Sequence, residues 1–245
     1  METANYAYSE IAKMIDHSLL NPVLTAEELE AGCKLALKYD VASVCILPYY
    51  AARCAEVLSG SSVKTSTTIG FPHGGHRTSV KAFEAAQALK DGASELDMVI
   101  NISKAKSGDW QYVSEEIREL TGLTHDGGAK IKVIFENFYQ TDEAKIRLCE
   151  ICGEIGVDWV KTSTGYAGGG ATMEDLALMR RHSPSHVQVK AAGGIRDLDT
   201  LLKVRSLGVS RIGSTRTATQ LEDCRARLGL APLDARSGIT TVAGY

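Results

Sequence analysis

Short runs of β-branched and other apolar residues alternate along the chain with longer amphipathic segments. The longer segments repeat apolar residues at the spacing of one helix face, and the short runs have the length and composition of buried strands. The predicted helices cover residues 25–39, 49–58, 78–91, 110–123, 142–155, 172–182, 197–207 and 217–228. The predicted strands are Met14–Asp16, Ser43–Ile46, Lys64–Ile69, Glu95–Ile100, Lys130–Glu136, Trp159–Thr162, Val187–Ala191 and Arg211–Ser214.

The order of these segments predicts the fold class. Strand and helix alternate eight times within 245 residues, which favours parallel pairing and closure into an α/β barrel, the (β/α)8 or TIM-barrel fold. No linker or charge block divides the sequence, so we expect residues 1–245 to form a single domain. The glycine and small-residue content of residues 234–245 is typical of a mobile C-terminal tail.

A second regularity links several predicted helices to the strands that follow them. Three of the helices end at Gly92, Gly156 or Gly208, which suits a left-handed C-cap, and Asp40 occupies the same place once. Equivalent positions on different strands of a barrel lie at a similar depth, so residues at equal spacing after these caps should converge. The fifth residues after the four caps are Asp97, Lys161, Gly213 and Cys45.

Polar and apolar residues alternate along two predicted strands. In Val187–Ala191 the apolar residues share one face, and Gln188 and Lys190 share the other. Helices cover the outside of such a barrel, so the apolar face points outward and Lys190 points inward. The same reasoning turns Lys132 and Glu136 inward. Because an unpaired interior charge is costly, we expect these charges to pair with one another or to take part in chemistry.

Composition and charge exclude several classes of partner. Hydrophobic residues make up 44% and charged residues 23% of the chain, and a net charge of −3 gives no basis for binding nucleic acid or an anionic membrane. No apolar run approaches the roughly 18 residues of a membrane helix. The N-terminus lacks the basic and apolar regions of a signal peptide. We therefore expect a cytoplasmic protein.

The six cysteines show no disulfide framework and are expected to be free thiols. Cys149 and Cys152 form a C-x-x-C pair, and His182 and His186 lie near them in sequence, so a structural zinc site is the weaker alternative. Because apolar-rich helices often bury free cysteines, we favour the interpretation without a metal.

Two lysines stand near the carboxyl ends of predicted strands, where barrel enzymes place their active site. Lys161 lies in Trp159–Gly165, and Lys190 lies in Val189–Gly194. Two ammonium groups held close together disfavour each other's charge, and a partly neutral lysine can attack a carbonyl to form an imine. Asp97 supplies a carboxylate for proton transfer or for an ion pair with one of the lysines. The pattern predicts Schiff-base chemistry.

Glycine-rich loops precede the last three predicted helices. Gly168–Gly170 precedes the first, whose expected N-cap is Thr172; Gly193 and Gly194 precede the second, and Gly213–Ser214–Thr215 precedes the third. Such loops allow backbone N–H groups and helix N-termini to face a phosphate. This fold often binds phosphate after its seventh and eighth strands. The sequence therefore predicts a small phosphorylated substrate.

Motifs along nearly the whole chain resemble those of the deoxyribose-phosphate aldolases, the metal-free class I aldolases of deoxynucleoside breakdown. The resemblance implies reversible cleavage of 2-deoxy-D-ribose 5-phosphate to D-glyceraldehyde 3-phosphate and acetaldehyde, with no metal or other cofactor. It also implies a homodimer. The motifs that hold Lys161 and Lys190 are highly specific to the family. The matching segments are Ile15–Leu20, Ser43–Cys45, Gly70–Gly74, Glu95–Asn101, Lys161–Gly165, Val189–Arg196 and Arg211–Gly213.

The resemblance implies roles for particular residues. Lys161 would form the Schiff base, and Lys190 would lower the pKa of Lys161. Asp97 would transfer protons together with Lys190 and a water molecule, with support from Asp16. Similar enzymes also end in tyrosine, which implies that Tyr245 can reach the active site from the tail. The glycines that would surround the phosphate are Gly165, Gly193, Gly194 and Gly213.

The chain departs from the family pattern at the expected phosphate end. The usual Gly-Ala-Ser-Ser segment reads Gly213–Ser214–Thr215–Arg216, and Tyr166 stands where some members carry lysine. The Arg216 guanidinium can form a bidentate pair with a phosphate, or it can turn outward to Glu222 or Asp223; we favour the phosphate. Phe135–Tyr139 also differs from the common Leu-Glu-Thr pattern.

Three other functions are compatible with parts of this pattern. One is a Schiff-base aldolase of the same fold that acts on another phosphorylated or unphosphorylated aldose. Another is a sugar-phosphate isomerase with Glu136 as its base, which leaves both inward lysines unexplained. The third is a catalytically silent phosphate-binding barrel, which requires none of Lys161, Lys190 and Asp97.

Overall fold

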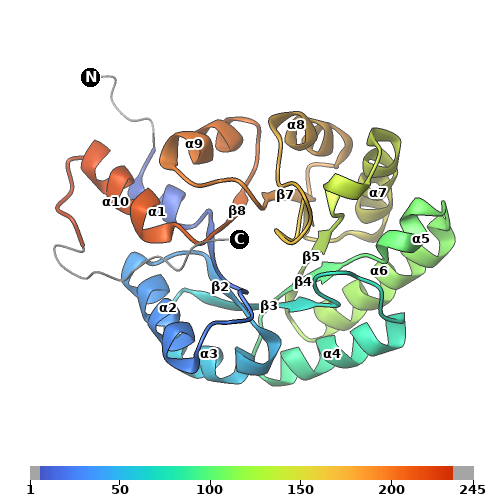
Figure 1. The fold of residues 1–245 in the computed structure, drawn as a ribbon, viewed down its shortest axis with the longest axis horizontal. Helices are drawn as coiled ribbons and strands as arrows, with labels where there is room; N and C mark the ends of the chain where they lie inside the picture. The colour runs from blue at the N-terminus through green and yellow to red at the C-terminus, as the bar shows by residue number, and fades with distance from the viewer. Residues whose placement is uncertain (1–5, 234–245) are drawn as a thin grey trace.

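The computed structural model describes residues 6–233, and within them eight parallel strands form one closed barrel (Figure 1). The strands follow one another round the barrel in chain order, and β8 pairs with β1 to close it. The TIM-barrel fold predicted from the sequence is confirmed. The strands are β1 (Ile15–Leu19), β2 (Ser43–Ile46), β3 (Lys64–Ile69), β4 (Glu95–Val99), β5 (Lys130–Ile134), β6 (Trp159–Lys161), β7 (Gln188–Ala191) and β8 (Arg211–Ser214).

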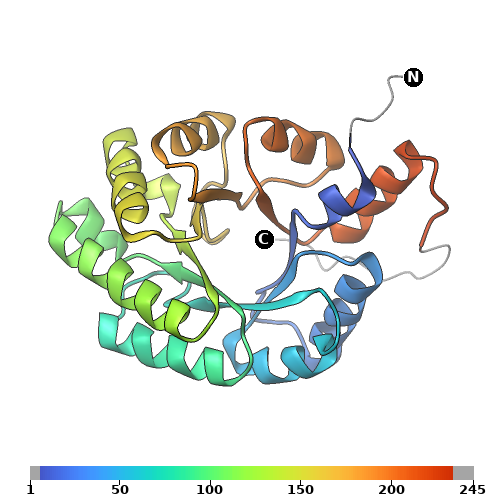
Figure 2. The same cartoon turned by 180° about the vertical axis from the view of Figure 1, so that it is seen from behind.

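Helices form a ring outside the barrel (Figure 2). Two helices of five residues each, α1 (Tyr8–Ala12) and α5 (Ile102–Lys106), are absent from the prediction, because little more than one turn is too short to show the apolar period of a helix face. The other helices are α2 (Ala26–Tyr39), α3 (Ala51–Leu58), α4 (Thr78–Lys90), α6 (Trp110–Asp126), α7 (Asp142–Ile155), α8 (Met173–His182), α9 (Leu198–Ser206) and α10 (Thr217–Arg227), with 3-10 helices η1 (Pro48–Tyr50) and η2 (Asn137–Tyr139).

The predicted strands agree closely with the observed ones. The bounds of β2, β3 and β8 are as predicted, whereas β1 begins one residue later and runs three residues further. β4, β5 and β6 end one or two residues before their predicted ends, although the N–H groups of Ile100, Phe135 and Thr162 still donate to carbonyl oxygens of the neighbouring strands. The predicted helix 49–58 begins instead with η1, which has proline at its first position, and continues as α3.

Left-handed residues lie at the ends of four helices, as the spacing predicts. Gly92, Gly156 and Gly208 have φ values of +91°, +82° and +84°, and Asp40 has a φ of +50°. Each turns the chain back toward the next strand, so residues at equal spacing after these caps reach a similar depth in the barrel. Thr172 is the N-cap of α8, as predicted, and its hydroxyl accepts a hydrogen bond from an N–H of the first turn.

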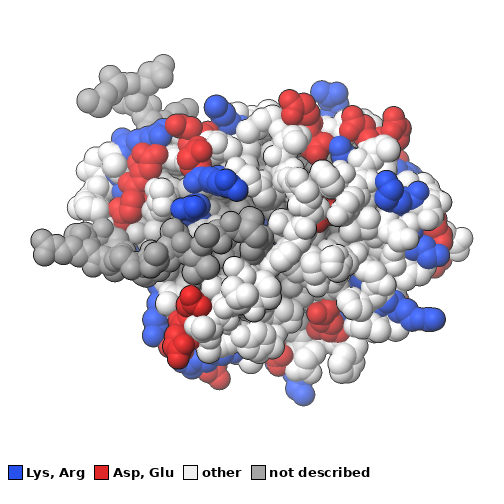
Figure 3. Space-filling view, viewed as in Figure 1, with Lys and Arg blue, Asp and Glu red and all other residues white. Residues whose placement is uncertain are grey.

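The apolar core lies between the barrel and its helices, whereas the barrel interior is polar. Ile131 and Val133 of β5 belong to the apolar core, but Lys132 between them contacts Asp97 inside the barrel. Lys190 also contacts Asp97. The predicted inward direction of both lysines is confirmed. On the face shown in Figure 3, most charged side chains that can be seen lie round the periphery.

The loop that follows β3 packs directly against the end of β4. Gly74 in this loop has a φ of +65°, and a Cβ atom at this position would lie 1.9 Å from the carbonyl oxygen of Ile100. The next residue, Gly75, has no heavy atom within 4 Å of the place its Cβ would take. Gly74 and Gly75 are therefore a matched pair of sites. A side chain at Gly74 would meet the backbone of Ile100, whereas one at Gly75 would change only the composition of the loop.

We expect Gly74→Ala to lower the free energy of unfolding by about 2–4 kcal/mol, because both the backbone angle and the contact with Ile100 must change. Gly75→Ala should change it by less than about 0.5 kcal/mol. Urea denaturation of the two variants measures both values. Equal stability of the two variants would contradict this account of the loop.

Candidate active site

One pocket opens at the carboxyl end of the barrel, lined by residues of β1, β2, β6, β7 and β8 and by the loops that follow them. Asp97 lies beneath this pocket, in contact with two lysines that line it. Tyr245 lies outside the described residues. The other expected site residues all line the pocket: Asp16, Lys161, Gly165, Lys190, Gly193, Gly194, Gly213, Ser214, Thr215 and Arg216.

Register between β6 and β7 places the two expected active-site lysines side by side. Lys161 and Lys190 are directly paired positions of these strands, and both side chains point inward. One carboxylate oxygen of Asp97, Oδ2, lies 2.7 Å from the Nζ of Lys161 and 2.8 Å from the Nζ of Lys190. All three side chains are buried. Two ammonium groups thus share one carboxylate oxygen.

The environments of the two lysines shift their pKa values in opposite directions. Burial lowers the pKa of Lys161, and although Asp97 opposes this, the Lys190 cation adds to the lowering. Burial acts on Lys190 as well, but Asp16 and Asp97 outweigh it and raise the pKa of Lys190. Burial also disfavours the charge of Asp97, yet three lysines led by Lys132 hold its pKa well below the usual range. Lys161 is therefore the lysine that most readily becomes neutral.

Further charged side chains lie beneath these groups and complete one ion-pair network. The Nζ of Lys132 lies 2.6 Å from Glu95 and 2.8 Å from Asp97. Arg211 lies 2.9 Å from Glu95 and also pairs with Asp16. The sequence predicted that Lys132 points inward, but no role was predicted for Glu95 or Arg211. Glu95 could have been identified from the two-residue period of a strand, which places it on the same face of β4 as Asp97.

The loop after β7 faces the pocket with its backbone. Gly193 and Gly194 have φ values of +79° and +88°, which favour glycine. Gly168–Gly170, which the sequence analysis also expected near the phosphate, does not line the pocket. It packs behind this loop instead: a Cβ atom on Gly170 would lie 2.6 Å from the carbonyl carbon of Gly193. Gly170 thus permits close backbone packing that supports the loop, whereas Gly168 and Gly169 lie against the ring of Phe138.

The end of β8 lines the pocket beside the loop after β7. The hydroxyl of Ser214 donates to the side chain of Gln220 at 2.7 Å and accepts from the N–H of Arg216 at 2.9 Å. The Ser214 hydroxyl therefore shapes the turn into α10. Arg216 lies at the N-cap of this helix and lines the pocket.

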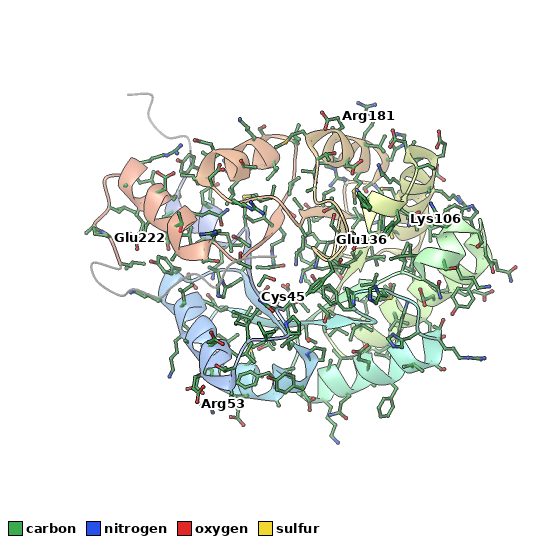
Figure 4. All side chains as sticks on the ribbon, viewed as in Figure 1. Cys45, Arg53, Lys106, Glu136, Arg181 and Glu222 are labelled. Carbon is green, nitrogen blue, oxygen red and sulfur yellow. The ribbon has the colours of Figure 1, made fainter. Side chains whose placement is uncertain are left out.

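Asp223 and Glu222, the alternative partners considered for Arg216, form an ion pair and a hydrogen bond with other residues. Asp223 forms an ion pair with Arg227 at 2.8 Å. Glu222 accepts a hydrogen bond from the Tyr39 hydroxyl at 2.7 Å. In Figure 4, Glu222 lies in the outer ring of helices, away from the middle of the barrel where Cys45 is labelled.

Glu136, the base of the isomerase alternative, binds the neighbouring loop and does not line the pocket. Its carboxylate accepts hydrogen bonds from the N–H and the hydroxyl of Thr164, and burial raises its pKa. Its backbone has a φ of +53°, which is unusual for glutamate. The hydroxyl of Tyr166 donates to the carbonyl oxygen of Leu20 at 2.6 Å, so the loop after β6 is also tied to the loop after β1.

All six cysteines are free and buried, as expected for the thiols. Cys45 lines the pocket, whereas Cys149 faces the carbonyl oxygen of Met179 and His186 faces that of Gly153. Within residues 6–233, no group of three or more His, Cys, Asp or Glu side chains is placed to hold a metal ion. In the same residues, no helix has the length and apolar character needed to cross a membrane.

Lysines and a carboxylate that converge at the carboxyl end of a closed α/β barrel define a class of enzymes that form imines with carbonyl substrates. Comparison with known proteins assigns the family: the chain belongs to the DeoC/LacD family of aldolases, whose pattern matches residues 10–213. The shared pattern covers the strands that carry all four interior cations, Lys132, Lys161, Lys190 and Arg211.

Two deoxyribose-phosphate aldolases are similar to this chain over most of their length. The deoxyribose-phosphate aldolase of Rhodopirellula baltica is 61% identical over 242 residues, covering 99% of this chain and 100% of the relative. That of Thermococcus gammatolerans is 46% identical over 218 residues, covering 88% of this chain and 97% of the relative.

Solved structures share the fold. A structure described as QR15, an aldolase, has a TM-score of 0.84 at 37% identity and covers 89% of this chain and 97% of its own. The tetrameric deoxyribose phosphate aldolase of Aeropyrum pernix has a TM-score of 0.83 at 29% identity and covers 90% of this chain and 93% of its own.

Cys45 supports a prediction about this pocket. Burial raises the pKa of its thiol, so the nucleophilic thiolate is scarce at neutral pH. We expect a small unsaturated aldehyde to inactivate the protein slowly at pH 7 and progressively faster as the pH rises, with the adduct on Cys45. Peptide mapping and loss of aldolase activity measure this. The prediction is wrong if Cys45→Ala is inactivated as fast as the wild type.

Proposed function

We propose that this protein cleaves 2-deoxy-D-ribose 5-phosphate reversibly to D-glyceraldehyde 3-phosphate and acetaldehyde through a Schiff base on Lys161. The observation that carries the proposal is the position of Lys161 at the floor of the pocket, 2.7 Å from an Asp97 oxygen that Lys190 also contacts. A buried lysine with a lowered pKa has a larger neutral fraction, and the neutral amine is the nucleophile.

The first half of the reaction forms the imine. The neutral amine of Lys161 attacks C1 of the open-chain aldehyde, and the carbinolamine formed then loses water to give a protonated imine. Asp97 lies within hydrogen-bond distance of both the Lys161 and the Lys190 amines, so Asp97 and Lys190 can carry the protons that these steps move. Asp16 contacts Lys190 at 2.5 Å and supports its orientation.

The second half breaks the carbon–carbon bond. The C3 hydroxyl loses its proton, the C2–C3 electron pair moves into the imine, and D-glyceraldehyde 3-phosphate leaves. The enamine that remains takes a proton at C2, and water hydrolyses the resulting imine to acetaldehyde and the free Lys161 amine. The protonated imine is the electron sink, so this chemistry requires no metal or other cofactor.

The opposite end of the pocket fits the phosphate. Gly165, Gly193 and Gly194 border it with backbone that has positive φ. Gly213, Ser214, Thr215 and Arg216 lead into the N-terminus of α10, and a helix N-terminus favours an anion. These residues are the proposed phosphate site.

Three further expectations stay proposals. The family resemblance supports a homodimer, and a cytoplasmic location is proposed together with it. Tyr245 is proposed to assist proton transfer at the enamine carbon, in keeping with the tyrosine that ends similar enzymes.

Chemical trapping tests the central assignment. Borohydride reduction in the presence of acetaldehyde should fix a two-carbon adduct on Lys161, which peptide mapping identifies. Lys161→Arg should lower the cleavage rate by about three orders of magnitude or more, because arginine keeps the charge but cannot act as the amine nucleophile. An adduct on Lys190, or none at all, would overturn the assignment.

Substrate comparison tests the phosphate site. Arg216→Ser should raise KM for 2-deoxyribose 5-phosphate by about ten- to a hundredfold with a smaller change in kcat, the result of losing uniform binding. Cleavage of unphosphorylated 2-deoxyribose should hardly change, and Arg216→Lys should recover part of the loss because it restores the charge. Equal effects on both substrates would make Arg216 a structural residue.

A further inference from the structure

The charged side chains inside the barrel are unequal in number. Ion pairs of 2.5–3.5 Å link four cations and three carboxylates into one network. Arg211 is 13% exposed and the others no more than 4%. With every group charged, the network holds one positive charge in excess. Its members are Asp16, Glu95, Asp97, Lys132, Lys161, Lys190 and Arg211.

The geometry points to Lys132 as a positioning residue that makes Lys161 the group to give up its proton, with Glu95 as the counterweight that limits this effect. The inference rests on the proposed Schiff-base role of Lys161 and adds that its reactivity is set from beneath the pocket. Lys132 and Glu95 do not line the pocket, so they act without touching the substrate.

The number of carboxylates around each cation decides which one loses its proton. Lys132 lies within 3.5 Å of three carboxylates. Lys190 and Arg211 each pair with two. Among the carboxylates of residues 6–233, Lys161 contacts Asp97 alone, through an oxygen that it shares with Lys190. Releasing the proton of Lys161 therefore balances the network at the loss of the fewest ion pairs.

Lys132 acts through Asp97. Its Nζ binds Oδ1 of Asp97 at 2.8 Å, and the Ser66 hydroxyl lies 3.2 Å from the same oxygen. The other oxygen, Oδ2, is left for Lys161 and Lys190. Without the Lys132 cation, the network would hold three positive and three negative charges with Lys161 protonated, and Asp97 would stabilise that proton more strongly.

Other titratable groups near Lys161 leave this balance unchanged. Cys45 on β2 is neutral because burial raises the pKa of its thiol. His17 on β1 faces Thr217, and burial lowers its pKa to about 4, so it is neutral as well. Glu136 after β5 lies outside the ion-pair network, because its carboxylate bonds to Thr164, and burial raises its pKa.

The test is the pH dependence of imine formation. Cyanoborohydride trapping of acetaldehyde on Lys161 is followed across pH in full-length wild type, Lys132→Met, Glu95→Gln and the double variant. Removing the cation should move the midpoint of trapping up by about one to two pH units, because the proton on Lys161 is then balanced. Removing the carboxylate should move it down by a similar amount, and the double variant should return close to the wild-type midpoint.

A surface lysine on the same strand is the matched control. Lys130 lies two residues before Lys132 on β5 but is 60% exposed and pairs with Asp158 outside the network. Lys130→Met should leave the midpoint unchanged. Lys132→Arg, which keeps the charge, should restore at least part of the shift caused by Lys132→Met.

Opposite shifts distinguish electrostatics from packing. The inference is overturned if both single variants shift the midpoint in one direction, or if only the maximal rate falls. Circular dichroism shows whether Lys132→Met folds. If it does not, the direction in which Glu95→Gln moves the midpoint of trapping still tests the inference, since glutamine keeps the shape of the side chain. Failure to trap Lys161 in the wild type at any pH would overturn the proposed function itself; normal trapping with unmoved midpoints would overturn this inference only.

Discussion

The buried carboxylate of Asp97 is the group on which the active site depends. One of its oxygens binds Lys132 and Ser66, and the other binds Lys161 and Lys190. A carboxylate at this depth without cations would be held neutral by desolvation, so the lysines keep it charged. In return it holds three ammonium groups so close together that one is favoured to lose its proton. The proposed chemistry of Lys161 follows from that competition.

Closure of the barrel makes this competition possible. Strand register places Lys161 beside Lys190 and Asp97 beside Lys132. A closed barrel has no edge past which a long side chain could reach water, so interior charges must pair with one another. The helices and the apolar core outside the strands supply the stability that a charged interior does not. The carboxyl-end loops are then free to form the proposed phosphate end of the pocket.

Much of this architecture was predictable from the sequence, and the exceptions have physical causes. The recurring cap five residues before Asp97 and Lys161 predicted that these residues meet, because equal spacing gives equal depth in a barrel. The partners of Lys132 were not predictable, since alternation shows which way a side chain points but not which charge it meets. Gly168–Gly170 was expected near the phosphate but does not line the pocket, because glycine suits phosphate binding and close backbone packing equally. Only the approach to Gly193 separates the two.

A direct titration of the buried lysines tests whether charge balance controls Lys161. Heteronuclear NMR of protein labelled at the lysine side chains, with Lys161→Arg to assign the signal, would follow each ammonium group with pH. We expect Lys161 to titrate below the ordinary lysine range while Lys132 and Lys190 stay protonated above it. An ordinary pKa for Lys161, or loss of the Lys190 proton first, would contradict it.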